Sequence, residues 1–132
     1  MIMAPTEVRP EVTIVWPKEG ANPNLKQLLI YVSAPYSLGD VVSNVRIACE
    51  VGDKILTKGH IPVVPHLSHF WHFISPKSYG EWLRIDSAII PRCDALLRVD
   101  GESKGADIEV DIAHRSGIAV YYSLDDIPNW YE

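Results

Sequence analysis

Residues 28–34, LLIYVSA, constrain the fold of this chain more than any other stretch. They are apolar almost throughout, they favour strand formation, and Pro35 ends the run. An uninterrupted apolar strand of this kind is typical of a parallel sheet, in which helices cover both faces. We therefore expect residues 28–34 to form a core strand of an α/β fold.

Helical and strand-like stretches alternate after this run. We predict helices over 40–58, 79–90 and 106–115, and strands over 61–64, 95–99 and 118–122. Asp40 is suited to cap the first helix, and Gly59 to follow its end. Residues 66–78, rich in histidine and aromatic side chains, show no clean period and are predicted to form a long loop. The alternation favours a flavodoxin-like or Rossmann-like open, mainly parallel sheet with helices on both faces.

Apolar residues at helical spacing mark the side of each helix that should face the core. They include Leu56 in the first predicted helix and Ile108 in the last. The tail 123–132 is expected to add one more turn.

The length of 132 residues and the hydrophobic content of 47% suit one compact domain. We place this domain at 28–132. Residues 1–27 contain four prolines and resist regular structure, except for a short strand-like run at 12–16. They are interpreted as an N-terminal extension that adds an edge strand or covers a partner subunit.

Charge and composition limit the partners and the compartment. The formal net charge is -5 and no basic run is present, which argues against binding to a nucleic acid polymer. No apolar stretch has membrane-spanning length, and the start lacks the order of a signal peptide. Cys49 and Cys93 form no spaced pair, as expected in a reducing compartment. We therefore expect a cytoplasmic protein.

A turn of small residues before the last predicted helix forms a candidate anion site. Ser103, Lys104 and Gly105 follow the strand 95–99, and Glu109 comes in the first turns of the helix after them. Free backbone N–H groups and the helix dipole favour an anion there, which would hold a phosphate and keep Glu109 ionised. Since ligands of open α/β sheets bind at the carboxyl ends of the strands, Glu109 is a candidate nucleophile.

Several spaced residues resemble one family. They are Tyr31 in IYVSAPY, Asn44 in the first predicted helix, Asp86 eight residues before Asp94, and SKGADIE over 103–109. Over about residues 28–122 this pattern resembles the nucleoside 2-deoxyribosyltransferase-like superfamily. The resemblance implies a flavodoxin-like fold, action on the N-glycosidic bond of a nucleoside or nucleotide, and no metal or organic cofactor.

The resemblance also implies a role for each residue of the site. Glu109 attacks the anomeric carbon, Asp86 holds or protonates the leaving base, and Tyr31 orients the carboxylate. Ser33 contributes to substrate binding, and Ser103 meets the 5′ end of the sugar. The chemistry is consistent, because a carboxylate stabilises the cationic sugar of the transition state and a second, drier carboxyl group can protonate the base.

Ser103 bears on the choice of substrate. In relatives that act on free nucleosides an acidic residue stands at this place, whereas relatives that act on nucleoside monophosphates have serine. A hydroxyl beside Lys104 and helix amides accepts phosphate where a carboxylate repels it. The sequence thus favours a nucleotide, with a serine that only caps the helix as the alternative.

His66, His69 and His72 are spaced by three and follow His60, which raises the question of a metal site. Neither HExxH nor CxxC is present, so we predict no metal. A wall in which His66, His69 and Trp71 stack on a nucleobase is favoured over a metal site, and packing in a core or interface is favoured over both.

Three classes of function remain as hypotheses. The first is an enzyme that cleaves a nucleoside 5′-monophosphate by hydrolysis or by transfer of the sugar to another base; the alternative for its two acids is that Glu109 and Asp86 are solvated charges on helix faces. The second is a non-catalytic nucleotide-binding or sensing module that keeps the anion site but not the chemistry. The third is a metal-dependent hydrolase built on the histidines, whose activity a chelator would remove. We expect a small-molecule nucleoside or nucleotide ligand and a homodimer or larger homo-oligomer.

Overall fold

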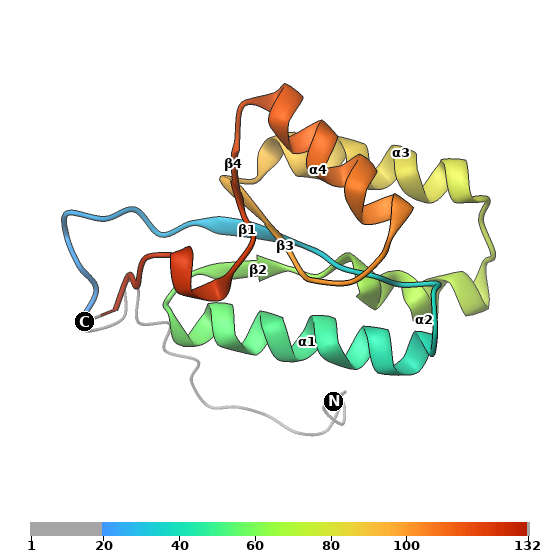
Figure 1. The fold of residues 1–132 in the computed structure, drawn as a ribbon, viewed down its shortest axis with the longest axis horizontal. Coiled ribbons are helices and arrows are strands. Elements are labelled where there is room, and N and C mark those ends of the chain that lie inside the picture. The colour runs from blue at the N-terminus through green and yellow to red at the C-terminus, as the bar shows by residue number, and fades with distance from the viewer. Residues whose placement is uncertain (1–19, 132) are drawn as a thin grey trace, which may run out of the picture.

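The structure, a computed structural model that describes residues 20–131, has a parallel sheet between two layers of helices (Figure 1). Neighbouring strands are parallel throughout the sheet, whose order is β2-β1-β3-β4. Its strands and helices are β1 Leu29–Ser33, α1 Val41–Thr57, β2 Ile61–Val63, α2 Ser68–Ile74, α3 Tyr79–Ile89, β3 Ala95–Arg98, α4 Lys104–Ser116 and β4 Ala119–Tyr121. The predicted α/β fold with an open parallel sheet is confirmed.

The sheet buries an apolar cluster on each face. Helix α1 covers one face, and α3 and α4 cover the other (Figure 1). The cluster on the α1 side contains Ile30, Val32, Ala34, Ala48, Val51, Ile55, Ala95, Leu97 and Ile127. The cluster on the α4 side contains Tyr31, Ile90, Cys93, Leu96 and Ala113. Burial of such side chains contributes about 1.5 to 3 kcal/mol each, so these clusters supply most of the folding free energy.

The alternation of side chains along β1 determines what lies under α4. Ile30 and Val32 face α1, so Tyr31 and Ser33 face the opposite side. Ser33 Oγ also lies 3.3 Å from the backbone carbonyl oxygen of Ala106 in α4. Two hydroxyl groups are thereby fixed beneath the helix that carries Glu109.

The predicted caps of α1 are confirmed. The Asp40 side chain accepts from the backbone N–H of Val42 at 3.2 Å, and Gly59 follows the helix with φ of 95°. In that left-handed conformation a side chain would be strained, and a Cβ would also lie 3.1 Å from the ring of Tyr131. Helix α4 starts at Lys104, before the predicted start at 106, because Ser103 caps it by accepting from the N–H of Ala106 at 3.1 Å.

The prediction of a loop over 66–78 was wrong. Residues 68–74 form the short helix α2, in which Phe70, Phe73 and Ile74 are 67%, 72% and 85% exposed. The helix therefore buries no apolar stripe against the core, although Phe70 and Ile74 are one helical turn apart.

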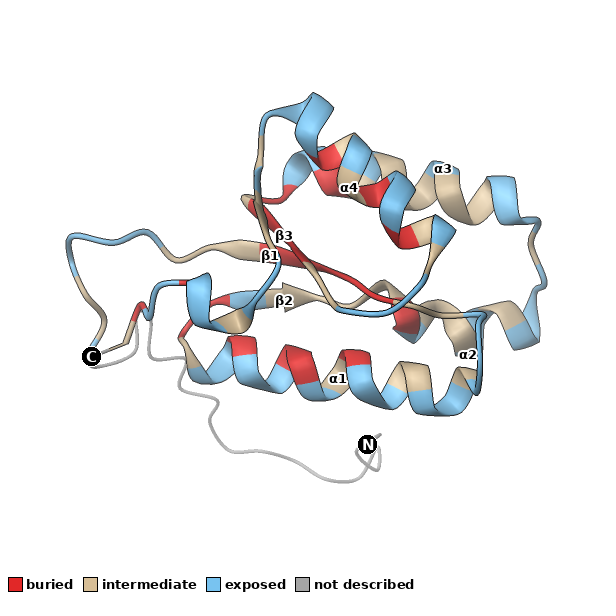
Figure 2. Ribbon diagram, in the orientation of Figure 1, coloured by how far each residue is buried: buried red, intermediate tan, exposed pale blue. Residues whose placement is uncertain are grey.

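Two expectations about buried helix positions were also wrong. Leu56 is 49% exposed and Ile108 is 39% exposed. Figure 2 shows buried and exposed residues on different sides of α1. Both lie on the outer edge of the apolar stripe of their helix. In α4 the buried positions are Ala106, Glu109 and Ala113, a spacing that places a carboxylate in the layer next to the sheet.

The two ends of the described chain are attached to the same side of the domain. Ala21 forms an antiparallel bridge with Tyr131, and the indole N–H of Trp130 donates to the carbonyl of Leu25 at 2.9 Å. The tail forms the predicted additional turn at Leu124–Asp126. Most of the predicted extension, including the strand at 12–16, lies outside the described residues.

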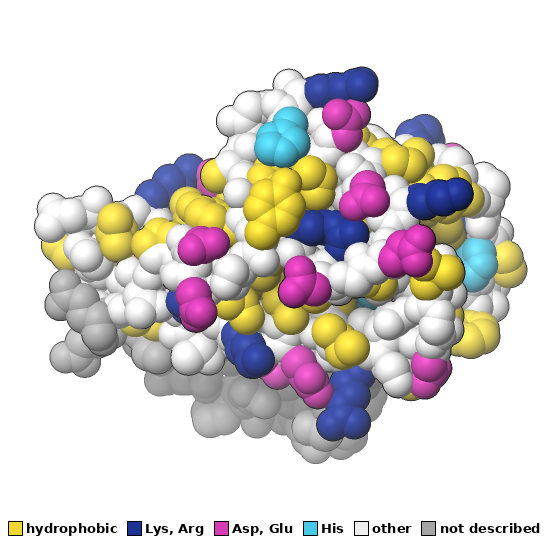
Figure 3. All heavy atoms as spheres, in the orientation of Figure 1, with side chains coloured by type: hydrophobic (Ala, Val, Ile, Leu, Met, Phe, Trp, Pro, Cys, Tyr) yellow, Lys and Arg dark blue, Asp and Glu magenta, His cyan; other side chains and the backbone are white. Residues whose placement is uncertain are grey.

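Charges of both signs are interspersed on the face shown in Figure 3, with no field of a single sign. Within residues 20–131, no helix has the length and apolar character needed to cross a membrane.

Candidate active site

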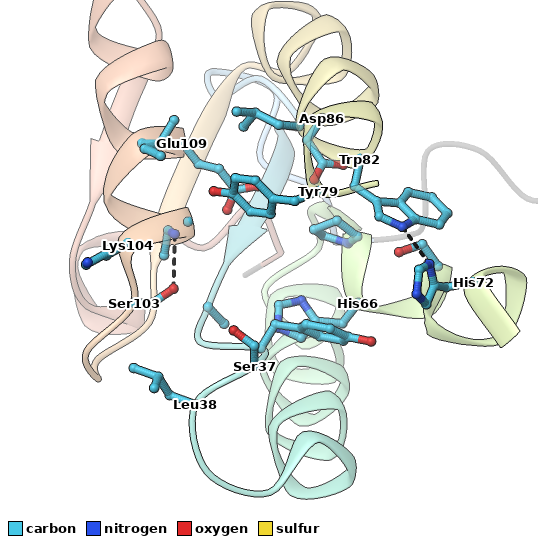
Figure 4. A pocket seen from close by; sticks show the side chains of 18 of the residues that line it. Ser37, Leu38, His66, His72, Tyr79, Trp82, Asp86, Ser103, Lys104 and Glu109 are labelled. Carbon is cyan, nitrogen blue, oxygen red and sulfur yellow. Dashed lines mark hydrogen bonds between the residues drawn. The ribbon is translucent and has the colours of Figure 1, made fainter. Parts of the chain in front are cut away.

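A cavity of 860 Å³ lies at the carboxyl ends of β1 and β3 (Figure 4). The chain leaves β1 toward β2 and leaves β3 toward β4, so the two connections diverge at this point of the sheet. Such a divergence creates the crevice in which open α/β sheets bind ligands. Four segments line the cavity: the turn after β1, the segment after β2, helix α3, and the start of α4.

Glu109 lies in the second turn of α4 and lines the cavity, although its side chain is only 8% exposed. Each of its carboxylate oxygens receives a hydrogen bond from β1. The hydroxyl of Tyr31 donates to Oε2, and Ser33 Oγ donates to Oε1 at 2.9 Å. The predicted contact between Tyr31 and Glu109 is present, and Ser33 holds the second oxygen. The carboxylate is thereby fixed in orientation before any ligand binds.

Asp86 reaches the same cavity from α3 (Figure 4). Helices α3 and α4 cover the same face of the sheet, so these two acidic side chains converge instead of lying on opposite sides. Burial raises the pKa of Asp86 to about 6, and the nearby hydroxyl of Tyr31 opposes this rise. Tyr31 thus lies between the two carboxyl groups.

The pKa of Glu109 is raised to about 7, mainly by burial, while hydrogen bonds from Tyr31 and Ser33 oppose the rise. The negative charge of Asp86 raises this pKa further, and Arg98 lowers it. The expectation that the helix N-terminus keeps Glu109 fully ionised was wrong, since the dipole weakens beyond the first turn and desolvation dominates. Between the two pKa values the coupled pair holds one proton, mainly on Glu109, whose pKa is the higher. Acid and nucleophile chemistry requires the other one-proton form, with the proton on Asp86 and Glu109 ionised.

Ser103, Lys104 and Gly105 line the cavity at the N-terminus of α4, as predicted. The Ser103 hydroxyl oxygen accepts the helix-capping bond, and its hydrogen is available to a ligand. The preceding turn is fixed by Arg98, which donates to the carbonyl of Gly101 at 2.8 Å and pairs with Asp107 at 3.0 Å.

The aromatic wall of the cavity differs in part from the prediction. His66 lines it, but His69 and Trp71 do not. His69 Nδ1 lies 2.5 Å from the hydroxyl of Tyr36, and Trp71 packs edge-to-face on Trp82 outside the cavity. These two side chains lie outside the cavity lining because residues 68–74 are helical. Ser68 and His72, one turn apart, face the cavity instead.

The chain matches a protein family described as a domain of unknown function, DUF7768, over residues 28–123. It belongs to this family. No curated protein matches its sequence. The match extends from β1 past the end of β4, so the DUF7768 domain contains every residue that lines the cavity.

Sequence reasoning missed Tyr36, Tyr79, Trp82 and His72, which supply much of the cavity wall in this DUF7768 domain. A signal for two of them was available. Tyr79 and Trp82 precede Asp86 by seven and four residues, which is the spacing of one helix face. A helix that presents Asp86 to a ligand therefore presents both rings as well.

The histidines of the DUF7768 domain serve other contacts. Within residues 20–131, no cluster of three or more His, Cys, Asp or Glu side chains is placed to hold a metal ion. His60 is buried, where Nδ1 accepts from the N–H of Leu28 at 2.9 Å and Nε2 lies 2.6 Å from the carbonyl of Pro128. It joins the start of β1 to the C-terminal segment.

Proposed function

We propose that this chain is an N-glycosidase, similar in chemistry to nucleoside 2-deoxyribosyltransferases, that cleaves the N-glycosidic bond of a nucleoside 5′-monophosphate. One observation carries the proposal. Glu109 and Asp86 enter one cavity from α4 and α3, and burial raises the pKa of both carboxyl groups, so that the pair can share one proton near neutral pH.

In the first step, the ionised Glu109 carboxylate attacks C1′ of the sugar. The C1′–N bond breaks, its electron pair goes to the base, and protonated Asp86 gives the departing nitrogen a proton. The transition state is a cationic, oxocarbenium-like sugar, which a negative charge on Glu109 stabilises. Tyr31 and Ser33 hold the carboxylate in place while one of its oxygens forms the ester bond with C1′ of the sugar.

In the second step, water attacks C1′ of the sugar ester on Glu109. Asp86, now a carboxylate, takes a proton from this water, and Glu109 leaves as a carboxylate. The pair returns to its starting state with one proton, and the products are a free base and a sugar phosphate. Attack by a second base in place of water would give transfer instead of hydrolysis.

The remaining cavity residues suit the two ends of such a substrate. The amides at the start of α4, with Ser103 and Lys104, suit the 5′-phosphate. Trp82 and Tyr79, which extend from the same helix as Asp86, offer aromatic surfaces to the base. A nucleotide bound in this way would have its sugar over Glu109.

The test is a panel of nucleoside 5′-monophosphates, with base release followed by chromatography. Glu109→Gln should abolish release and keep the fold, because glutamine has the same shape without the nucleophilic charge. Asp111→Asn is the matched control, since Asp111 is an exposed acid on the same helix and should not affect release. Saturable binding of a monophosphate without any product in the wild-type protein would contradict the enzyme and support the non-catalytic binding module.

A further inference from the structure

The two ring nitrogens of His66 have different environments. Nε2 lies 2.8 Å from the backbone carbonyl of Pro35. A carbonyl oxygen only accepts, so Nε2 carries the hydrogen of the ring. Burial lowers the pKa of His66, which keeps the imidazole neutral. Nδ1 is therefore a hydrogen-bond acceptor with a free lone pair.

No group among residues 20–131 donates a hydrogen bond to this acceptor, although His66 is only 6% exposed. In the described part of the chain, every side-chain nitrogen or oxygen that is sealed from solvent has a partner. Nδ1 is consequently not sealed. Because His66 lines the cavity, its small accessible area opens there (Figure 4). A ligand with an N–H or O–H group can satisfy it.

The hydrogen bond between His66 Nε2 and the carbonyl of Pro35 holds Nδ1 of His66 beside the proposed sugar subsite. Pro35 follows β1 two residues after Ser33, the residue that donates to Glu109 Oε1. In Figure 4 His66 lies below Glu109 and Asp86 and faces the same cavity. A sugar whose C1′ is within reach of Glu109 therefore has its hydroxyl groups close to this edge of the cavity.

We infer that His66 Nδ1 accepts a hydrogen bond from a hydroxyl of the substrate's sugar, so that the site selects ribonucleotides over sugars that lack this hydroxyl. The inference rests on the proposed function, which places the sugar over Glu109. A hydroxyl next to the reacting carbon is a favourable partner, because hydrogen bonds to it strengthen in the transition state of glycoside hydrolysis.

The second histidine of the cavity wall, His72, presents a hydrogen-bond donor to the cavity, whereas His66 presents an acceptor. His72 Nδ1 accepts from the indole N–H of Trp82 at 2.9 Å and from the backbone N–H of Lys77 at 3.1 Å. Its Nε2 therefore carries the hydrogen and is a donor. It stands next to Trp82, on the side of the base, where carbonyl and ring nitrogen acceptors occur. His66, which offers an acceptor, is therefore suited to the hydroxyl groups of the sugar.

The experiment compares ribonucleoside, 2′-deoxyribonucleoside and 3′-deoxyribonucleoside 5′-monophosphates of one base. In the wild-type protein, removal of the relevant hydroxyl should lower kcat/KM roughly 10- to 100-fold, the effect of one lost hydrogen bond to a buried acceptor. His66→Gln keeps an N–H for the carbonyl of Pro35 and removes the acceptor at Nδ1. It should lower kcat/KM for the ribonucleotide and leave the deoxynucleotide almost unchanged.

His114→Gln is the matched control, because His114 is an exposed histidine of α4 and the variant should keep full discrimination. The 2′-deoxy and 3′-deoxy arms identify which hydroxyl binds. Equal turnover of all three nucleotides by the wild-type protein would overturn the inference while the proposed function stands, and this result does not depend on the folding of any variant.

Dissociation constants measured with Glu109→Gln distinguish the two claims. Tighter binding of the ribonucleotide without turnover by the wild-type protein would contradict the glycosidase and retain the contact with His66. Absence of both cleavage and binding for all three nucleotides would contradict both.

Discussion

Glu109→Gln should stabilise the folded protein, by an amount that grows as the pH rises from about 4.5 to about 7 and is constant above that. Glutamine keeps the shape of the side chain and can still accept from Tyr31 or Ser33, but it carries no charge that must be buried. In the wild-type protein the pKa of Glu109 rises from 4.5 to about 7, mainly because burial disfavours the charged form. The variant removes this cost.

The magnitude follows from that rise. Each pKa unit corresponds to about 1.4 kcal/mol, so a rise from 4.5 to about 7 corresponds to about 3 kcal/mol. Because the folded-state pKa is the higher one, the contribution of Glu109 to stability is fully present below its unfolded pKa. It is lost as the pH rises through about 7. The variant should match the wild-type protein near pH 4 and exceed it by about 3 kcal/mol at pH 8 or above.

Thermal unfolding of both proteins between pH 4 and pH 9 measures this difference. For a chain of this size, about 3 kcal/mol corresponds to roughly 10 °C in Tm. Asp111→Asn on the same helix is the control. This variant loses only an exposed ion pair with Arg115 and should change stability by less than about 1 kcal/mol. An equal or lower Tm for Glu109→Gln at pH 8 would refute the claim that a buried, costly carboxylate lies at this position.

Three further predictions concern activity. Tyr31→Phe removes a hydrogen bond that lowers the pKa of Glu109. The acid limb of the pH profile of base release should therefore move up by about one pH unit or more, and an unchanged profile would contradict the contact between Tyr31 and Glu109. Lys104→Gln should raise KM for a nucleoside 5′-monophosphate about 3- to 10-fold and leave KM for the free nucleoside unchanged, and equal effects on both would exclude a phosphate contact. Trp82→Leu should weaken binding of the free base in calorimetry by about 1 kcal/mol, and no change would remove Trp82 from the base subsite.

The fold could be predicted because its signals are local. The apolar run at 28–34 identified β1, and helical spacing with Asp40 and Gly59 at the ends identified α1. A shared site for Asp86 and Glu109 was implied by the resemblance to a family and not by local signals, and the structure brings both side chains to one cavity because α3 and α4 pack on one face of the sheet.

The features that were missed depend on tertiary packing, which the spacing of residues in the sequence does not determine. Helix α2 escaped detection because its apolar side chains point to solvent. For the same reason the sequence did not indicate that Ser68 and His72, and not His69 and Trp71, line the cavity. The ionisation of Glu109 was misjudged because its burial depends on the sheet beneath it and not on its position in the helix. The homo-oligomer expected from the sequence stays a prediction.

Mass spectrometry of the peptide that contains Glu109 tests the central claim most directly. The protein would be mixed with nucleoside 5′-monophosphates, quenched in acid within a turnover and digested. The account predicts a mass increase on Glu109 that equals a sugar phosphate ester and that is absent in Glu109→Gln. Base release with no sugar on Glu109, or with the sugar attached to a different residue, would contradict it.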